Sequence, residues 1–224
     1  MSSKIQLVQY LDALNKPYLT VADLEKILGI ARPGLYVILH RLVKQSVLVR
    51  LRRGVYRGML GAADAAKIAN VLYYPSYLSF ESALARHGIL SQIPYTLTFA
   101  TPKRSKRMTL GDTAVEFRQL NETLFFGYTL EQGLYVAEPE KALLDELYLI
   151  TRGKATLDLD ALNLANLSRA KFLAYTQRFP EYVRTQAQAP AARFGETVAT
   201  LEKRERVRAT QTRRTDKRHL RSTD

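Results

Sequence analysis

Residues 20–56 read TVADLEKILGIARPGLYVILHRLVKQSVLVRLRRGVY, and this stretch predicts the fold of the N-terminal part of the chain. Thr20 can cap a helix over 21–28 whose apolar residues recur at helical spacing, and Gly29 ends that helix. A second helix follows, with Pro33 in its first turn, where a missing N–H costs little. Two short β-rich runs, 47–51 and 55–57, then flank an Arg-Arg-Gly turn. This order of elements predicts a winged helix-turn-helix.

The second predicted helix has two faces of different chemistry. One is an apolar stripe at i, i+3, i+4 and i+7, made by Leu35, Ile38, Leu39 and Leu42. The other is polar, aromatic and basic. With the arginines of the hairpin it gives the candidate DNA-binding residues, Arg32, Tyr36, Val37, His40, Arg41, Lys44, Arg50, Arg52, Arg53 and Arg57. A small helical bundle that binds nothing is the plainer alternative, but four arginines in and around one hairpin favour contact with DNA.

Charge is distributed unevenly along the 224 residues. Residues 1–60 hold ten Lys/Arg and three Asp/Glu, residues 61–183 hold thirteen of each, and residues 184–224 hold eleven and five. The net charges are therefore +7, zero and +6, which give the formal total of +13. A basic head and tail around a neutral middle indicate polyanion contact at one or both ends. We expect an α+β protein with a winged helix-turn-helix domain over 1–60, a mixed α/β domain over 61–183 and a basic, mobile tail over 184–224.

Several classes of protein are disfavoured by the sequence. It contains no cysteine, so a disulfide framework and thiolate metal sites are excluded. No apolar run approaches the roughly 20 residues that span a bilayer, and the start MSSKIQLVQYL lacks the features of a secretory signal peptide. We therefore expect a cytoplasmic protein without membrane contact. Known catalytic motifs are missing and the three histidines are scattered, so we expect no enzyme, no catalytic residue, no metal and no cofactor.

The remainder of the chain alternates between helical and β-rich patterns. It predicts helices over 5–14, 64–73, 79–87, 138–150, 158–164 and 168–178, and strands over 95–100, 113–120, 123–128 and 134–137. The helix over 138–150 is expected to bury Ala142, Leu143, Leu147 and Ile150. Its charged residues, Glu140, Lys141, Asp145 and Glu146, are expected to form a solvated face in which Lys141 and Asp145 pair at i, i+4. An acidic patch that meets a basic partner is the functional alternative, and the residues do not decide between the two.

A second basic cluster comprises Lys103, Arg104, Lys106 and Arg107, between Pro102 and Gly111. This composition predicts a loop between strands. A solvated loop is the simpler interpretation, and contact with DNA phosphates or a charged partner is the alternative. Glu81 and His87 lie six residues apart, which is not the i, i+4 spacing of a helical metal site, so an ordinary capped helix is expected there.

Three stretches resemble the AbiEi family of bacterial antitoxins, which come from abortive-infection toxin–antitoxin operons. They are LGIARPGLYVILHRLVKQSVLVRLRRGVY at 28–56, YLSFESALARHGIL at 77–90 and LFFGYTLEQGLYVAEPEKALLDELYL at 124–149. The last two are the more specific, because many regulators share a winged helix. The resemblance covers roughly residues 5–180.

The resemblance implies an antitoxin that represses its own operon through double-stranded operator DNA, expected to hold inverted repeats. Its second domain would counteract a toxin that resembles nucleotidyltransferases, and direct contact between the two proteins stays open. Two other functions also stay open from the residues: a ligand-sensing winged-helix repressor, and a nucleic-acid-processing enzyme, since carboxylate sites leave weak sequence marks.

The basic tail generates a first prediction. Residues 184–224 carry few large apolar residues, so we expect an electrostatic arm that raises DNA affinity without changing sequence preference. Deletion of residues 190–224 should weaken binding to operator and to random duplexes alike at low salt, and the difference should fade as salt rises. Unchanged affinity at low salt, measured by fluorescence anisotropy, would rule out the arm.

Overall fold

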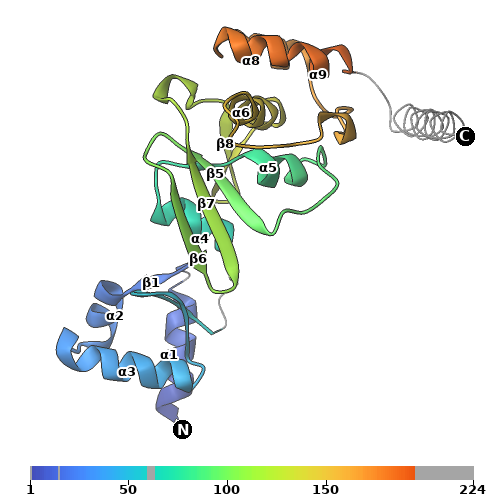
Figure 1. Ribbon diagram of the computed structural model, residues 1–224. Helices are drawn as coiled ribbons and strands as arrows, with labels where there is room; N and C mark the ends of the chain where they lie inside the picture. The colour runs from blue at the N-terminus through green and yellow to red at the C-terminus, as the bar shows by residue number, and fades with distance from the viewer. Residues whose placement is uncertain (1, 15, 60–63, 195–224) are drawn as a thin grey trace, which may run out of the picture. The chain divides into compact units, whose positions relative to one another are not determined.

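A computed structural model describes residues 2–14, 16–59 and 64–194, and Figure 1 shows the arrangement of its helices and strands. The N-terminal region contains α1 (Ser2–Ala13), β1 (Leu19–Thr20), α2 (Val21–Leu28), α3 (Arg32–Lys44), β2 (Leu48–Arg52) and β3 (Val55–Gly58). Its three strands are antiparallel and lie in the order β1-β3-β2. The predicted winged helix-turn-helix and the α+β fold class are confirmed.

A small apolar core holds the winged helix together. Leu24, Leu35 and Leu39 are almost fully buried and pack in one cluster with residues of α1, the sheet and the bend before β2, namely Leu11, Leu19, Val47, Leu48 and Tyr56. In the opening helix Ile5 is exposed, while Leu7 packs against the core. This core fixes the orientation of α3, because burial of its leucines turns the opposite side of the helix to solvent.

The ends of α2 are defined by side-chain and backbone caps. The Asp23 N–H donates to Thr20 Oγ1 at 3.1 Å, and the Thr20 N–H donates to Asp23 Oδ2 at 2.8 Å, which is a complete capping box. Hydrogen bonds from Thr20, and the nearby Lys16 ammonium, lower the pKa of Asp23 from 3.8 to about 2. At the other end Gly29 adopts φ +65°, and its N–H donates to the Glu25 carbonyl.

A six-stranded mixed sheet follows the winged helix in the chain. Its strands lie in the order β6-β7-β5-β4-β9-β8, with β5–β7 and β4–β9 parallel and the other pairs antiparallel. The elements are α4 (Ala65–Leu72), β4 (Tyr77–Leu78), α5 (Phe80–Arg86), β5 (Thr96–Thr101), β6 (Lys106–Leu110), β7 (Thr113–Gln119), β8 (Tyr128–Glu131) and β9 (Leu134–Ala137). Of the described residues, those within 2–83 and 94–138 form one compact unit, and those within 84–93 and 139–194 form a second. The predicted domain boundary near residue 60 stays a prediction.

The predictions for two segments in the region of the sheet were wrong. Lys106 and Arg107 are not loop residues, because they begin β6, which pairs with β7 from Lys106↔Phe117 to Leu110↔Thr113. Cross-strand pairing outweighs the local basic composition there. The predicted strand over 123–128 instead starts with a 3₁₀ turn, η1 (Glu122–Leu124), in which Asn121 Oδ1 accepts from the Thr123 N–H, and the strand β8 begins only at Tyr128. An Asn side chain that bonds the backbone two residues on favours such a turn over a strand.

The second unit continues as a set of helices, α6 (Pro139–Thr151), η2 (Leu159–Ala161), α7 (Arg169–Thr176), α8 (Glu181–Gln186) and α9 (Gln188–Ala192). Only the 3₁₀ turn η2 forms where a helix over 158–164 was expected. The predicted tail was also placed too early, since α8 and α9 cover 184–192 and the Phe194 ring lies 4.9 Å from that of Phe172. Residues 195–224 of the predicted tail lie outside the described residues. A deletion that tests the tail should therefore begin at 195.

The predicted solvated face of α6 was wrong. Glu140, Lys141, Asp145 and Glu146 are at most 3% exposed, because α7 and α8 pack on the helix. The Lys141–Asp145 pair is confirmed, but as a buried ion pair with the Lys141 ammonium 5.2 Å from the Phe179 ring. Burial lowers the pKa of Lys141, and Asp145 opposes that shift. Glu140 Oε1 accepts from the Ser168 N–H at 2.7 Å and so connects α6 to the start of α7.

The capping box of α2 generates a second prediction. The lowered pKa means that the Asp23 carboxylate stabilises the fold above about pH 4, and that this contribution is lost as pH falls through about 2. Asp23→Ala should cost about 1 kcal/mol at pH 7, with a smaller difference from wild type at pH 3. Denaturant unfolding at both pH values measures this, with exposed Asp12→Ala as the control. An Asp23→Ala difference that does not depend on pH would contradict the assignment.

Candidate nucleic-acid interface

The outward face of α3 carries every contact residue that was predicted on that helix. Arg32, Tyr36, Val37, His40, Arg41 and Lys44 are all exposed, with Tyr36 at 57% and Val37 at 63%. Arg32 lies at the start of the helix, where its Nε is 3.2 Å from Glu25 Oε2 on α2. No carboxylate belongs to this face of α3, so it presents donors, an aromatic ring and positive charge to solvent.

A groove of about 450 Å³ lies between α3 and the wing formed by β2 and β3. Residues of both elements line it, namely Tyr36, Leu39, His40, Val43, Arg50, Arg53, Gly54 and Tyr56. Leu39 and Tyr56 are buried and belong to the apolar core, whereas Tyr36, His40, Arg50 and Arg53 are exposed. The floor of the groove is therefore apolar, and its rim is basic and aromatic. Such a surface suits a nucleic acid, whose phosphates are anionic and whose bases are contacted in the grooves.

The four arginines of the wing fall into two pairs. Arg50 and Arg53 line the groove, whereas Arg57 Nη1 donates to the carbonyls of Gly58 and Met59 at 3.1 and 3.3 Å. Arg52 Nη1 lies 3.5 Å from Met108 Sδ on β6. The pairing of β2 with β3 shifts register between Arg50 and Arg52, and such a bulge redirects the side chains that follow it. Contact of Arg52 and Arg57 with DNA stays a prediction. The geometry favours Arg50 and Arg53 as the arginines that would contact DNA.

The β6–β7 hairpin reaches the wing. The Gly111 N–H in its turn donates to the Leu51 carbonyl on β2 at 2.9 Å. Gly111 has φ +61°, a conformation that favours glycine.

The second basic cluster, in and before β6, packs on an aromatic ring. The ammonium groups of Lys103 and Lys106 lie 5.7 and 4.9 Å from the Tyr73 ring centre, and Tyr73 Oη donates to the Arg104 carbonyl at 2.8 Å. Arg107 is exposed and pairs with Glu116 at 2.7 Å. All four basic side chains are exposed, and their contact with phosphates stays a prediction.

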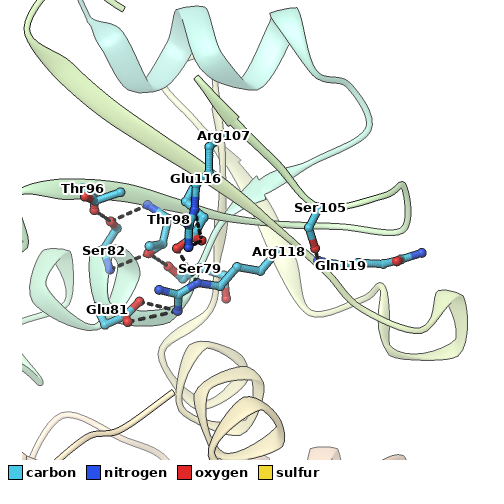
Figure 2. A network of polar contacts seen from close by, with 10 residues as sticks. All are labelled: Ser79, Glu81, Ser82, Thr96, Thr98, Ser105, Arg107, Glu116, Arg118 and Gln119. Carbon is cyan, nitrogen blue, oxygen red and sulfur yellow. Dashed lines mark hydrogen bonds and ion pairs between the residues drawn. The ribbon is translucent and has the colours of Figure 1, made fainter. Parts of the chain in front are cut away.

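A network of ion pairs on β7, shown in Figure 2, was missed by sequence reasoning. Arg118 Nη1 lies 3.0 and 2.9 Å from the two Glu81 carboxylate oxygens, and Arg118 Nε lies 3.0 Å from Glu116 Oε2. Burial would raise the pKa of Glu116, but its bonds to Arg107 and Arg118 hold that pKa below the ordinary value. The only signal in the sequence was the i, i+2 spacing of Glu116 and Arg118, which puts both on one face of a strand.

The same network fixes α5 on the sheet. The Thr98 N–H donates to Ser82 Oγ at 2.8 Å, and the Ser82 N–H donates to Thr98 Oγ1 at 3.2 Å (Figure 2). Thr98 Oγ1 in turn donates to the Ser79 carbonyl. The Glu81 carboxylate, named from the sequence as a candidate chemical group, is engaged by Arg118 in this arrangement. His87 lies just beyond the end of α5, and the two residues form no common site.

The fold and its exposed basic groove define a winged helix-turn-helix protein with a second α+β region. Residues 6–57 match the family model described as "Transcriptional regulator, AbiEi antitoxin", so this N-terminal region is similar to that family of regulators. The resemblance is thereby confirmed for the first of the three stretches, and the stretches at 77–90 and 124–149 lie outside the matched residues. No curated protein gives a significant match to the chain.

A similar fold is found among solved structures. The crystal structure of the RV2827C protein from Mycobacterium tuberculosis matches with a TM-score of 0.57 and 17% sequence identity, over 88% of this chain and 82% of that one. At this identity the likeness concerns the fold alone. Within the described residues, none of the helices has the length and apolar character to cross a membrane.

The division of the wing arginines generates a third prediction. Arg50→Ala plus Arg53→Ala should lower affinity for all DNA and reduce the slope of log K against log salt by roughly one to two, because each phosphate contact releases about one counterion. The matched control, Arg52→Ala plus Arg57→Ala, should retain the wild-type slope if both variants melt normally. Fluorescence anisotropy on a random duplex between low and high salt gives the slopes. Equal reductions in the two variants would show that all four arginines contact DNA.

Proposed function

We propose that this protein represses transcription of its own operon by binding operator DNA through α3 and the groove beside the wing. The observation that carries the proposal is the groove itself, in which exposed Tyr36 and His40 of α3 face Arg50 and Arg53 of the wing. A winged helix places the outward face of such a helix in the major groove while the wing contacts the backbone. The match of residues 6–57 to AbiEi transcriptional regulators supports it.

We further propose that the protein is an antitoxin whose residues beyond the winged helix counteract a nucleotidyltransferase-like toxin. Support comes from the family description and from the balanced charge of residues 61–183, which differs from that of the N-terminal region. The two stretches that resemble AbiEi antitoxins there contribute to β4, α5, β8, β9 and α6. Neutralisation does not require a stable complex in this proposal.

Binding rather than catalysis is the proposed mode of action, in the cytoplasm and without a cofactor. Two of the acidic residues that sequence reasoning considered are engaged in ion pairs: Glu81 with Arg118, and Asp145 with Lys141. A screen for metal-dependent nuclease and nucleotidyl-transfer activity tests this proposal, and any turnover that Glu81→Gln or Asp145→Asn abolishes would overturn it.

Ligand sensing is a second candidate, favoured by one observation. A cleft of about 480 Å³ on the β5–β7–β6 face is lined by Thr96, Arg107, Met108, Thr109, Ala114, Val115 and Glu116. Met108 contacts Arg52, and the turn of the same hairpin is hydrogen bonded to Leu51 on β2. A molecule in this cleft would therefore touch a strand that is connected directly to the wing.

The two proposed activities generate a fourth prediction. In the full-length chain, Tyr36→Ala plus Arg41→Ala should abolish repression of the operon promoter, because both side chains lie on the outward face of α3. The same variant should still rescue cells from the toxin of that operon. Tyr10→Ala plus Arg169→Ala, which removes an exposed Tyr and Arg elsewhere, is the matched control and should retain both activities.

A promoter reporter and a co-expression growth assay, at matched protein levels, give the two readouts. Selection from a random duplex library shows separately whether the purified protein prefers a sequence. Loss of rescue in the folded Tyr36→Ala plus Arg41→Ala variant would contradict the division into two activities. An operon without a toxin gene would favour the ligand-sensing repressor.

A further inference from the structure

Val37 lies in the middle of the outward face of α3. Its side chain is 63% exposed, and its neighbours one turn away on that face are Pro33, His40 and Arg41. Leu42 and Val43 pack against the apolar core of the winged helix, but Val37 is not among the residues of that cluster. An apolar side chain is therefore held in solvent, surrounded by polar and basic groups.

Helix stability does not account for a valine at this position. A β-branched side chain loses rotamer freedom in a helix, and at an exposed site alanine, lysine or arginine is preferred. Since Val37 buries little surface within the chain, its methyl groups contribute little to folding. These methyl groups remain available to a partner that docks on the basic face.

The positive charge around Val37 indicates what kind of partner this surface would bind. Arg41 and Lys44 on α3 and the groove arginines Arg50 and Arg53 give this surface affinity for a polyanion. When a helix of this kind lies in the major groove of DNA, the C5-methyl of thymine is the apolar group that the base edges present. An apolar side chain at the centre of the contacting face matches that methyl group.

We propose that Val37 reads a thymine in the operator by contact with its C5-methyl group, and so determines part of the sequence specificity. This inference rests on the proposed DNA-binding function. It requires a thymine at one position of the preferred sequence where loss of the methyl group alone weakens binding. The difference in affinity between the duplex with that methyl group and the duplex without it must also depend on Val37.

The test uses the duplex that the full-length protein selects from a random library. Each thymine in turn is replaced by deoxyuridine, which removes the methyl group and keeps every hydrogen-bonding group of the base. Loss of one buried methyl contact, at about 0.8 kcal/mol, corresponds to roughly fourfold weaker binding. We expect about this loss for wild type at one thymine of each half-site, with little change elsewhere.

The Val37→Ala variant should bind the thymine and deoxyuridine duplexes equally, because its shorter side chain no longer reaches the methyl group. Alanine is the better helix former, so this change should not unfold α3. Val71→Ala, at an exposed valine of α4, is the matched control and should discriminate as wild type does.

Two results would overturn the inference while leaving DNA binding intact: a selected duplex in which no thymine is sensitive to deoxyuridine, or a Val37→Ala variant that still discriminates. Failure to enrich any sequence from the library would instead remove the proposed function, and the inference with it.

Discussion

The burial of Leu35 and Leu39 is the constraint on which the outward face of α3 depends. A fully buried leucine contributes about 1.5–3 kcal/mol relative to an exposed one, so the pair outweighs the cost of leaving Tyr36 and Val37 in solvent. Successive residues of a helix are rotated by about 100°, and a rotation by one position would expose leucine and bury Tyr36 and His40. The apolar core with Leu24 and Leu48 therefore selects the outward face of α3.

The wing shows how backbone irregularity assigns different roles to identical side chains. Leu48 and Leu51 of β2 are both buried, but Leu48 belongs to the apolar core of the winged helix and Leu51 does not. The register of β2 against β3 shifts between Arg50 and Arg52. As a consequence Arg50 remains beside the groove, whereas Arg52 is directed toward Met108 and stabilises the approach of the β6–β7 hairpin.

The winged helix could be predicted closely because its signals are local. The caps at Thr20 and Gly29, Pro33 in the first turn of α3 and the spacing of Leu35 and Leu39 all act within one or two turns of the chain. The exposure of the predicted contact residues of α3 followed from that periodicity. The errors arose where contacts between elements decide the structure: β6 forms because it pairs with β7 in a hairpin, and the Glu81–Arg118 ion pair joins residues that are far apart in sequence.

The interior position of α6 also carries a consequence for the uniqueness of the fold. A leucine-rich helix that is buried around its whole circumference has no water-facing side to set its rotation about its own axis. The Lys141–Asp145 pair and the bond from the Ser168 N–H to Glu140 supply that alignment, because any other rotation would leave buried charge without a counterpart. We therefore expect these polar groups to fix one rotation of α6, and an all-apolar α6 to pack in more than one orientation.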